Sequence, residues 1–343
     1  MQARAVVFTA PNTVEVQNVS CPDPGPDDLV VRVTHSWISN GTEGSYLRGE
    51  RIAGDTPYRE GDDWPFPVVA GYQKVGVVEW VGDHITDVDV GETVFATMGA
   101  VGGMFEPRGG QVSPSVCRRD GVWKLPSCGS GEAASGSCEP LAYAGMVLTQ
   151  VGYNCGARPA FELGDGAVVV GDGLVGQWAA QTLAWRGAEV VLVGRHDDRL
   201  AKFGPGPARH VVNAKSTDWK SAVRSLLPQG VQVGVDTVGS VELVMDLFDV
   251  MRRFAHLVSA GFYGTQDAVS LQPLRYKELA VHLASGWWPD RMDHTRRLIA
   301  TGQLQTLPLI THRFPVLDAA RAWELIESKR EPVLGVILDW GTE

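Results

Sequence analysis

The chain has 343 residues, 44% of them hydrophobic and 20% charged, with a formal net charge of -10. This length favours two domains, and the apolar fraction excludes a disordered chain. The acidic balance argues against a nucleic-acid partner, since such a surface needs basic residues. No apolar run approaches the roughly 20 residues of a membrane helix, and the N-terminus lacks a signal-peptide pattern. We therefore expect a cytoplasmic protein with no membrane partner.

The first third of the chain predicts short β-strands separated by turns. Apolar or alternating runs occur at 14–16, 29–33, 75–81 and 93–96. A breaker stretch rich in proline and aspartate, at 21–28, separates the first two runs. Many short strands with frequent turns are typical of a partly closed barrel.

The pattern changes near Pro140 to an alternation of helices and strands. A helix is expected at 141–150, and strands follow at 166–170, 189–193, 231–236 and 256–260. Helices at 174–186 and 241–253 lie between them, and further helices are expected at 292–301 and 318–328. Such alternation predicts an α/β domain with a doubly wound parallel sheet. A last strand at 333–338 is expected to rejoin the first domain.

A glycine-rich motif follows the strand at 166–170 and opens the next helix. It is Gly171-Asp172-Gly173-Leu174-Val175-Gly176, which matches GxGxxG. Its first glycine permits a tight turn, its second allows a pyrophosphate to approach, and its third permits close packing of helix and strand. In this setting the motif predicts dinucleotide binding by Gly171, Gly173, Leu174, Val175 and Gly176, with the pyrophosphate at the helix N-terminus.

The end of the second strand bears on which dinucleotide is bound. An NAD site usually has an acidic residue there that binds the ribose hydroxyls. This chain has Gly194 and Arg195; the glycine leaves room, and the guanidinium suits a 2′-phosphate. We therefore favour NADP(H). The alternative, with Arg195 solvated and Asp197 as the acidic residue, leaves NAD(H) open.

Several landmarks identify the family that the chain resembles. They are Gly41-Thr42-Glu43, Pro67-Val68-Val69-Ala70-Gly71, Gly91-Glu92-Thr93-Val94, Glu139-Pro140-Leu141-Ala142, Asp236-Thr237-Val238-Gly239, Ala260-Gly261-Phe262-Tyr263-Gly264 and Pro308 to Phe314. With the glycine motif, they resemble the medium-chain dehydrogenase/reductase superfamily, the zinc-type alcohol dehydrogenase-like proteins, over essentially the whole chain.

The resemblance implies an architecture and further cofactor contacts. It implies a GroES-like β-barrel catalytic domain at 1–138 and 276–343, an inserted Rossmann NAD(P)-binding domain at 139–275, and a cleft where substrate meets nicotinamide. It adds Thr237, Gly261 and Phe262 to the cofactor-binding residues, and it implies a homodimer or homotetramer.

The positions of the zinc ligands depart from the family pattern. Asn40 replaces the ligand Cys, and Tyr72 and Gln73 replace the His-Glu after Gly71, so that only Glu139 remains. Zinc favours three or four Cys, His or carboxylate ligands. The five cysteines are scattered with no CxxC pair, which favours small buried residues over a zinc knuckle. We predict no metal. These variants resemble the bacteriochlorophyllide hydroxyethyl dehydrogenase branch, which also lacks the ligands.

Without a metal, a side chain must handle the proton on the reacting oxygen. Thr42 matches the family's proton-relay hydroxyl and is the first catalytic candidate. Tyr72 is the second, and its pKa near 10 must fall for acid-base work; Lys74, two residues on, would lower it if the segment is extended. Glu139 is a further candidate base. The alternatives are an aromatic filler for Tyr72, a surface cation for Lys74 and a bond to backbone amides for Glu139.

Five more residues are expected to line a substrate pocket: Asn40, Glu43, Gln73, Trp287 and Trp288. The tryptophans form either a stacking wall or ordinary packing. The predicted function is zinc-independent, NADP(H)-dependent interconversion of a secondary alcohol and a ketone on a polar polyol, sugar or natural-product substrate. One alternative is a zinc-free enone, quinone or enoyl reductase. Another is a protein that binds NADP(H) without turnover.

Overall fold

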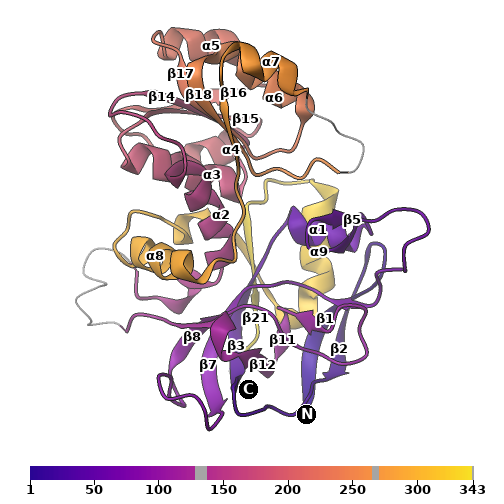
Figure 1. Cartoon of the computed structure of the whole chain (residues 1–343). Helices are drawn as coiled ribbons and strands as arrows, with labels where there is room; N and C mark the ends of the chain where they lie inside the picture. Colours follow the sequence, from indigo (N-terminus) through magenta and orange to yellow (C-terminus); the bar gives the residue numbers. More distant parts are fainter. Residues whose placement is uncertain (128–136, 265–269, 342–343) are drawn as a thin grey trace. The chain divides into compact units, whose positions relative to one another are not determined.

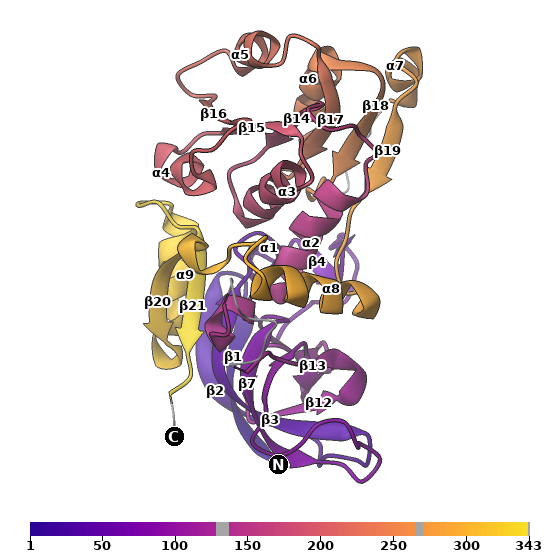
Figure 2. The same ribbon diagram turned by 90° about the vertical axis from the view of Figure 1, so that its left-hand side faces the viewer.

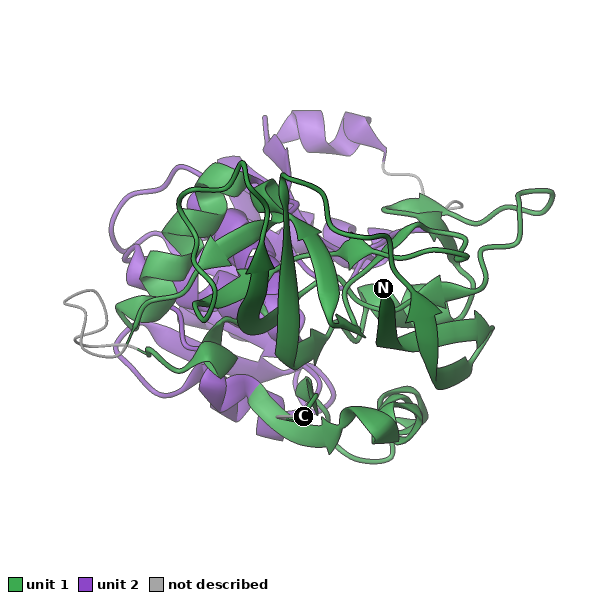
Figure 3. Ribbon diagram, turned by 90° about the horizontal axis from the view of Figure 1, so that it is seen from below, with its two compact units in different colours: residues 1–146, 289–302, 310–343 green, residues 147–288, 303–309 purple. Residues whose placement is uncertain are grey.

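The structure, a computed structural model, describes residues 1–127, 137–264 and 270–341. It divides into two compact units (Figure 3). Unit 1 comprises Met1–Met146, Pro289–Gly302 and Ile310–Glu343, and unit 2 comprises Val147–Trp288 and Gln303–Leu309. The sequence predicts domain boundaries at 138/139 and 275/276, whereas the two compact units change at 146/147 and 288/289. The second change lies later because residues 280–283 add a strand to the parallel sheet.

Unit 1 is a body of mainly antiparallel strands. Its larger strands are β1 (Gln2–Ala10), β2 (Thr13–Ser20), β3 (Asp28–Ile38), β7 (Lys74–Val81), β8 (Thr93–Ala96), β12 (Ser115–Arg118), β13 (Val122–Lys124), β20 (Ile310–Pro315) and β21 (Gly335–Asp339). Shorter ones are β4 (Arg51–Ala53), β5 (Thr56–Pro57), β6 (Val68–Val69), β9 (Gly99–Ala100), β10 (Arg108–Gly109) and β11 (Val112–Ser113). One sheet has the order β13-β8-β7-β3-β21-β20, and another has the order β11-β1-β2. The strands predicted in the first third are confirmed within β2, β3, β7 and β8, and the GroES-like barrel is confirmed.

The last strand joins the first part of the chain. β21 pairs antiparallel with β3 and parallel with β20, which confirms the predicted return to the first domain. The helices of unit 1 are α1 (Thr42–Leu47), α8 (Pro289–Ala300) and α9 (Ala319–Ser328). Phe8 of β1 contacts Trp323 of α9 edge to face, with ring centroids 5.3 Å apart. Val336 and Leu338 of β21 are buried in the same core, so residues from both chain ends form one apolar cluster.

Unit 2 is a doubly wound parallel sheet (Figures 1 and 2). Its strand order is β16-β15-β14-β17-β18-β19, and every neighbouring pair is parallel. The strands are β14 (Gly166–Val170), β15 (Glu189–Gly194), β16 (Arg209–Asn213), β17 (Val231–Asp236), β18 (Met251–Ser259) and β19 (Ala280–Leu283). The helices are α2 (Met146–Ala157), α3 (Leu174–Trp185), α4 (Asp197–Leu200), α5 (Trp219–Leu226), α6 (Val241–Val250) and α7 (Leu271–Tyr276). The predicted Rossmann architecture is confirmed.

The β-branched strands of unit 2 support a core on each face of the sheet. Alternate residues along β14 point to opposite faces, so Val168 packs with residues of α5, α6 and α7, and Val169 packs with residues of α2, α3 and α4. Figure 2 shows these two groups of helices on opposite sides of the strands. Two buried faces explain why the strand sequences are continuously apolar rather than alternating.

Two predicted helices differ from the structure. The helix expected at 141–150 is a short 3₁₀ helix, η3 (Pro140–Tyr143), followed by α2. The helix expected at 241–253 ends at Val250 because Met251 begins β18. No helix of the described residues is both long enough and apolar enough to cross a membrane.

The cysteines fall into two groups. Cys21, Cys117 and Cys155 are buried free thiols, as expected. Cys138 is disulfide-bonded, which the sequence analysis did not predict. Cys128 lies outside the described residues.

Candidate active site

The glycine-rich loop of unit 2 joins β14 to α3. Gly171 has a left-handed φ of 118°, and a Cβ on Gly176 would lie 1.9 Å from the Gly171 carbonyl oxygen. Gly173 caps α3 with extended backbone, and no heavy atom lies within 4 Å of the position of its missing Cβ. Leu174 and Val175 begin the helix, whose first N–H groups are free to bind an anion. The loop therefore has the close packing and the open side that a pyrophosphate site requires.

Two more loops end at the same edge of the sheet. Both the amide and the hydroxyl of Thr237, after β17, donate to the Val170 carbonyl at 3.0 Å. After β18, a Cβ on Gly261 would lie 2.0 Å from the Gly239 amide nitrogen, and Phe262 follows directly. The carboxyl edge of a doubly wound sheet is where such folds bind ligands. The predicted cofactor residues of three loops thus lie along one edge.

A residue that the sequence analysis left without a role organises the end of β15. The Asp172 Oδ2 accepts hydrogen bonds from the amides of Arg195, at 2.7 Å, and of His196, at 2.9 Å. The His196 Nδ1 lies 2.9 Å from the same oxygen, and the Arg199 guanidinium lies 3.4 Å from Oδ1. A Cβ on Gly194 would lie 2.4 Å from Asp172 Oδ2. The space at Gly194, expected to serve a cofactor, is therefore filled by Asp172.

The two side chains weighed for cofactor choice have different surroundings. The Arg195 side chain is exposed, and it has no hydrogen bond or ion pair with any residue in the described part of the chain. Asp197 accepts a hydrogen bond of 2.7 Å from the Asn213 side-chain amide. An unpaired guanidinium is available to a phosphate, whereas the Asp197 carboxylate already has a donor.

In unit 1, the positions of the family's zinc ligands hold neutral side chains with partners of their own. The Asn40 amide donates to the Leu334 carbonyl at 2.9 Å. The buried Gln73 amide donates to the Trp37 carbonyl at 3.4 Å. Among the described residues, no group of three or more His, Cys, Asp or Glu side chains is placed to hold a metal ion. Since zinc needs such donors, the residues present at these positions do not fit a zinc ion.

Tyr72 and Thr42 belong to one cluster of hydroxyl groups. Burial raises the pKa of the Tyr72 phenol, and its hydrogen bonds to the side chains of Ser39 and Thr42 oppose that rise only in part. Thr42 begins α1 and is half-buried. The requirement for a lowered Tyr72 pKa is therefore not met, because the ring is buried near the Glu43 carboxyl, which also raises it. At neutral pH Tyr72 is a neutral phenol that donates and accepts hydrogen bonds.

Glu43 lies behind this cluster as a buried carboxyl group. Its Oε1 accepts from the Ser39 amide at 2.8 Å, and its Oε2 accepts from the Gln111 side-chain amide at 2.7 Å. Burial raises the pKa of Glu43 from 4.5 to about 8. A Cβ on Gly71, whose φ is 79°, would lie 2.6 Å from Gln111 Cγ. Gln111 thus packs against Gly71, the residue before Tyr72, and also donates a hydrogen bond to Glu43. The local sequence around Gln111 gave no sign of either contact.

Lys74 does not take the position expected of it. The side chain is fully buried, and its Nζ has no hydrogen-bond partner in the described structure. Burial lowers the pKa of Lys74, and the nearby Cys117 and Cys21 oppose this only in part. Lys74 is not among the groups that shift the pKa of Tyr72. The two residues do not share a strand face because β7 begins only at Lys74. The surface alternative is also wrong.

The remaining candidates are exposed. Glu139 precedes η3, where its carbonyl accepts from the Ala142 amide. Burial lowers the pKa of His35, which the charge of Glu139 slightly opposes, and a hydrogen bond to Asp339 raises the pKa of Arg313, to which Glu139 adds a little. It has no hydrogen bond to the hydroxyl cluster in the structure described.

Trp287 and Trp288 lie in a segment that α2 holds in place. Their side chains are 43% and 58% exposed. The buried Gln150 side chain donates to the Trp288 carbonyl at 3.2 Å and accepts from its amide at 3.1 Å. Trp287 has a left-handed φ of 74°, a conformation that costs free energy in a non-glycine residue. Both rings are therefore exposed on a backbone segment that α2 fixes, and whether they bind substrate stays a prediction.

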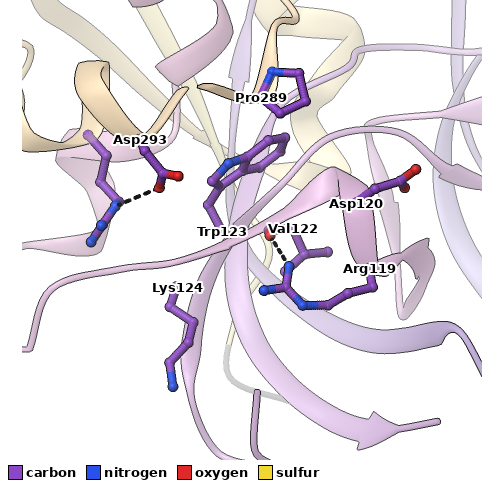
Figure 4. Close-up of a pocket in the computed structure, with 8 residues that line it drawn as sticks. Arg119, Asp120, Val122, Trp123, Lys124, Pro289 and Asp293 are labelled. Carbon is purple, nitrogen blue, oxygen red and sulfur yellow. Dashed lines mark hydrogen bonds and ion pairs between the residues drawn. The ribbon is translucent and has the colours of Figure 1, made fainter. Parts of the chain in front are cut away.

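Unit 1 also has a pocket of about 380 Å³ away from these residues (Figure 4). Its lining residues come from η1 (Arg119–Gly121), β13 and α8, and Trp123 lies beside Pro289. Its cations are already paired, since Lys124 lies 2.5 Å from Glu92 and Arg296 lies 3.6 Å from Asp293. We assign no function to this pocket.

Comparisons with known proteins agree with the architecture. A family model described as "Zinc-binding dehydrogenase" matches residues 175–298. The 2-desacetyl-2-hydroxyethyl bacteriochlorophyllide A dehydrogenase of Cereibacter sphaeroides is 27% identical, and the match covers 99% of each chain. An alcohol dehydrogenase of Escherichia coli CFT073, solved with NADH, has a TM-score of 0.81 at 19% identity and covers 99% of each chain. A protein of Sinorhizobium meliloti 1021, titled as a zinc-binding dehydrogenase and bound to NADP, has a TM-score of 0.79 at 20% identity and covers 99% of each chain.

A barrel unit, a doubly wound unit and a glycine-rich loop at its sheet edge define an oxidoreductase of the alcohol dehydrogenase type. The chain is thus similar to dehydrogenases over almost its whole length, and residues 175–298 match the zinc-binding dehydrogenase family, in agreement with the resemblance to the medium-chain dehydrogenase/reductase superfamily.

Proposed function

We propose that this protein is a zinc-independent, NADP(H)-dependent oxidoreductase that interconverts a secondary alcohol and a ketone on a polar substrate. Candidate substrates are a polyol, a sugar derivative and a modified natural-product ring. The observation that carries the proposal is the replacement of the metal-ligand positions by Asn40, Tyr72 and Gln73, next to a cluster of hydroxyl groups. A hydroxyl cluster supports proton transfer at an alcohol oxygen without a Lewis acid.

The chain's own residues handle the proton. During ketone reduction, Thr42 donates its hydroxyl proton to the developing alkoxide and accepts a proton from Tyr72, to which it is hydrogen-bonded. The phenol takes a proton from water in the same relay, so that the net proton comes from solvent. Burial raises the pKa of Tyr72, so the phenol stays neutral throughout the neutral range and relays a proton rather than ionising. In alcohol oxidation the same hydroxyls pass the proton in the opposite direction.

The cofactor is held by the three loops at the sheet edge. The glycine-rich loop and the N-terminus of α3 bind the pyrophosphate, and Arg195 binds the 2′-phosphate. When bound, the nicotinamide supplies or accepts the hydride. The exposed rings of Trp287 and Trp288 offer an apolar surface on which a sugar or ring face can stack.

A substrate panel tests the reaction. The purified protein is assayed for NADPH oxidation with secondary ketones and with matched enones that share their carbon skeletons. We expect turnover with ketones, and oxidation of NADPH by enones alone would overturn the proposal. Tight NADPH binding with no turnover on a broad carbonyl and alcohol panel would favour a non-catalytic binding protein.

Metal analysis tests zinc independence separately. We expect less than stoichiometric zinc in the purified chain and unchanged activity after dialysis against a chelator. About one zinc per chain, with activity lost on its removal and restored by its return, would contradict the proposal.

A further inference from the structure

The carboxylate of Asp172 accepts several hydrogen bonds from residues at the end of β15, and the glycine motif alone does not explain them. A standard GxGxxG motif needs only its glycines, and the residue between the first two is unspecified. Here that residue is an aspartate, 6% exposed, whose carboxylate has four donors at the end of the neighbouring strand. A buried carboxylate with this many partners is fixed in position. The loop after β15 is therefore attached to the loop after β14.

The geometry fixes the backbone on both sides of Arg195. The amides of Arg195 and His196 point at Asp172 Oδ2. Gly194 has no side chain because Asp172 Oδ2 and Cβ would lie 2.4 and 2.5 Å from its Cβ. His196 and Arg199 direct their side chains to the same carboxylate. The Arg195 guanidinium alone among these groups is left exposed and unpaired within the described residues.

We propose that Asp172 is a positioning residue for cofactor choice: by binding the backbone at Arg195 and His196, it holds the Arg195 guanidinium where a 2′-phosphate binds. This inference rests on the proposed use of NADP(H). Asp172 touches no reacting atom, and it acts through Arg195. Gly194 is the matching requirement, since any side chain there displaces the carboxylate.

The direction in which Asp172→Asn changes the affinity for NADPH distinguishes a positioning role of Asp172 from simple charge repulsion. Asp172→Asn removes a negative charge near a binding phosphate, and through-space repulsion alone therefore predicts tighter NADPH binding. Loss of positioning predicts weaker NADPH binding, since charge-assisted hydrogen bonds to the backbone are lost. NADH, which has no 2′-phosphate, is expected to bind with little change in either case.

The experiment measures the dissociation constants of NADPH and NADH by calorimetry for the full-length chain and its variants. Wild type is expected to prefer NADPH, and Asp172→Asn is expected to reduce that preference about tenfold through weaker NADPH binding. Asp198→Asn, with the same charge change on an exposed residue of α4, is the matched control: it measures the through-space effect alone and is expected not to weaken NADPH binding. Gly194→Ala is expected to reduce the preference for NADPH as Asp172→Asn does. The double variant Asp172→Gly, Gly194→Ala is expected to show the same preference as Asp172→Gly alone.

The inference would be overturned if Asp172→Asn kept the wild-type preference or bound NADPH more tightly. It would also be overturned if the variant bound NADPH and NADH more weakly by the same factor, which would indicate a merely structural role. Arg195→Ala separates this inference from the proposed function. If wild type prefers NADPH and Arg195→Ala loses that preference while Asp172→Asn keeps it, only the role of Asp172 is wrong. If wild type shows no preference, the proposed NADP(H) dependence and the inference are both wrong.

Discussion

The Gln111 side-chain amide donates to the Glu43 carboxyl at 2.7 Å, while the Gln111 Oε1 is buried with no partner among the described residues. The orientation of a glutamine amide is assigned from its surroundings, and rotating it by half a turn would bring Oε1 to the carboxyl. A protonated Glu43 would then donate to that oxygen. The raised pKa of Glu43, about 8, agrees with a carboxyl that is protonated at neutral pH.

Glu43 makes stability depend on pH. Its pKa is about 8 in the folded chain and near 4.5 when exposed, so the folded state binds the extra proton between these values. Its stabilising contribution is complete below pH 4.5 and is lost as the pH rises through 8, by about 1.4 kcal/mol per pH unit at most. We expect Glu43→Gln to unfold at a temperature that is less sensitive to pH over this window. The check is thermal unfolding of both proteins from pH 5 to 9.

A matched control for this measurement is Glu242→Gln, on the first turn of α6, where the side chain is exposed. This variant should keep the wild-type dependence on pH. Parallel curves for wild type and Glu43→Gln would show that Glu43 titrates normally.

The hydroxyl cluster predicts a graded loss of activity. Thr42→Val removes the hydroxyl that transfers the proton and is expected to lower kcat by about 10²-fold or more. Tyr72→Phe leaves Thr42 in place and is expected to cause a smaller loss, because solvent can replace the second proton donor. Steady-state kinetics with saturating NADPH measure both effects. Thr34→Val, a hydroxyl of β3 that donates to Val75, is the control, and full activity in Thr42→Val would exclude the relay.

Replacement of Lys74 is expected to stabilise the chain. Its Nζ is buried without a hydrogen-bond partner in the described structure, and such a group costs about 1–3 kcal/mol. Lys74→Met keeps the length of the side chain and removes the amine. Because burial lowers the pKa of Lys74, the unfolded chain binds the extra proton, and the gain should shrink as the pH rises toward 10.5. Chemical denaturation at pH 7 and pH 9.5 measures this, with the exposed Lys202→Met as control.

If Lys74→Met destabilised the chain at both pH values, the amine would have a partner that the described structure lacks. Equal stabilisation at both pH values would mean that the lysine keeps its proton in the folded chain throughout this range, as it does in the unfolded chain.

The segment at Trp287 predicts a change in substrate affinity. Trp287→Ala is expected to raise KM for a ring-bearing substrate several-fold, by about the 1 kcal/mol of one aromatic contact, while kcat changes little. Gln150→Ala is expected to do the same, because it removes both hydrogen bonds to the Trp288 backbone. Trp185, which is 46% exposed on α3, supplies the control Trp185→Ala. A KM unchanged in both test variants would assign the segment to packing alone.

Local patterns were sufficient to predict most of the fold. The β-branched runs of β14, β15 and β17 and the glycines between Gly171 and Gly176 specify their structure within a few residues of themselves. The return of β21 to the barrel was also predictable, since an isolated apolar strand at the end of a chain needs a sheet to join.

The site was less predictable because its contacts join distant positions. Asp172 meets Arg195 across 23 residues, and Gln111 meets Glu43 across 68. The error at Lys74 has a local cause. Alternation along a strand was assumed from Tyr72 onward, and Gly71, with a φ of 79°, turns the chain before the strand begins.

The position of β21 also constrains how the protein folds during synthesis. β21 lies inside its sheet, between β3 and β20, so a strand formed by residues 335–339 occupies a central place among strands formed mainly by residues 28–124. Every strand of the parallel sheet precedes residue 284. The parallel sheet can therefore form while residues 35–38 of β3 still lack their partner β21 and are able to pair with other chains. We therefore expect the barrel sheet to be complete only after residues 335–339 have been synthesised.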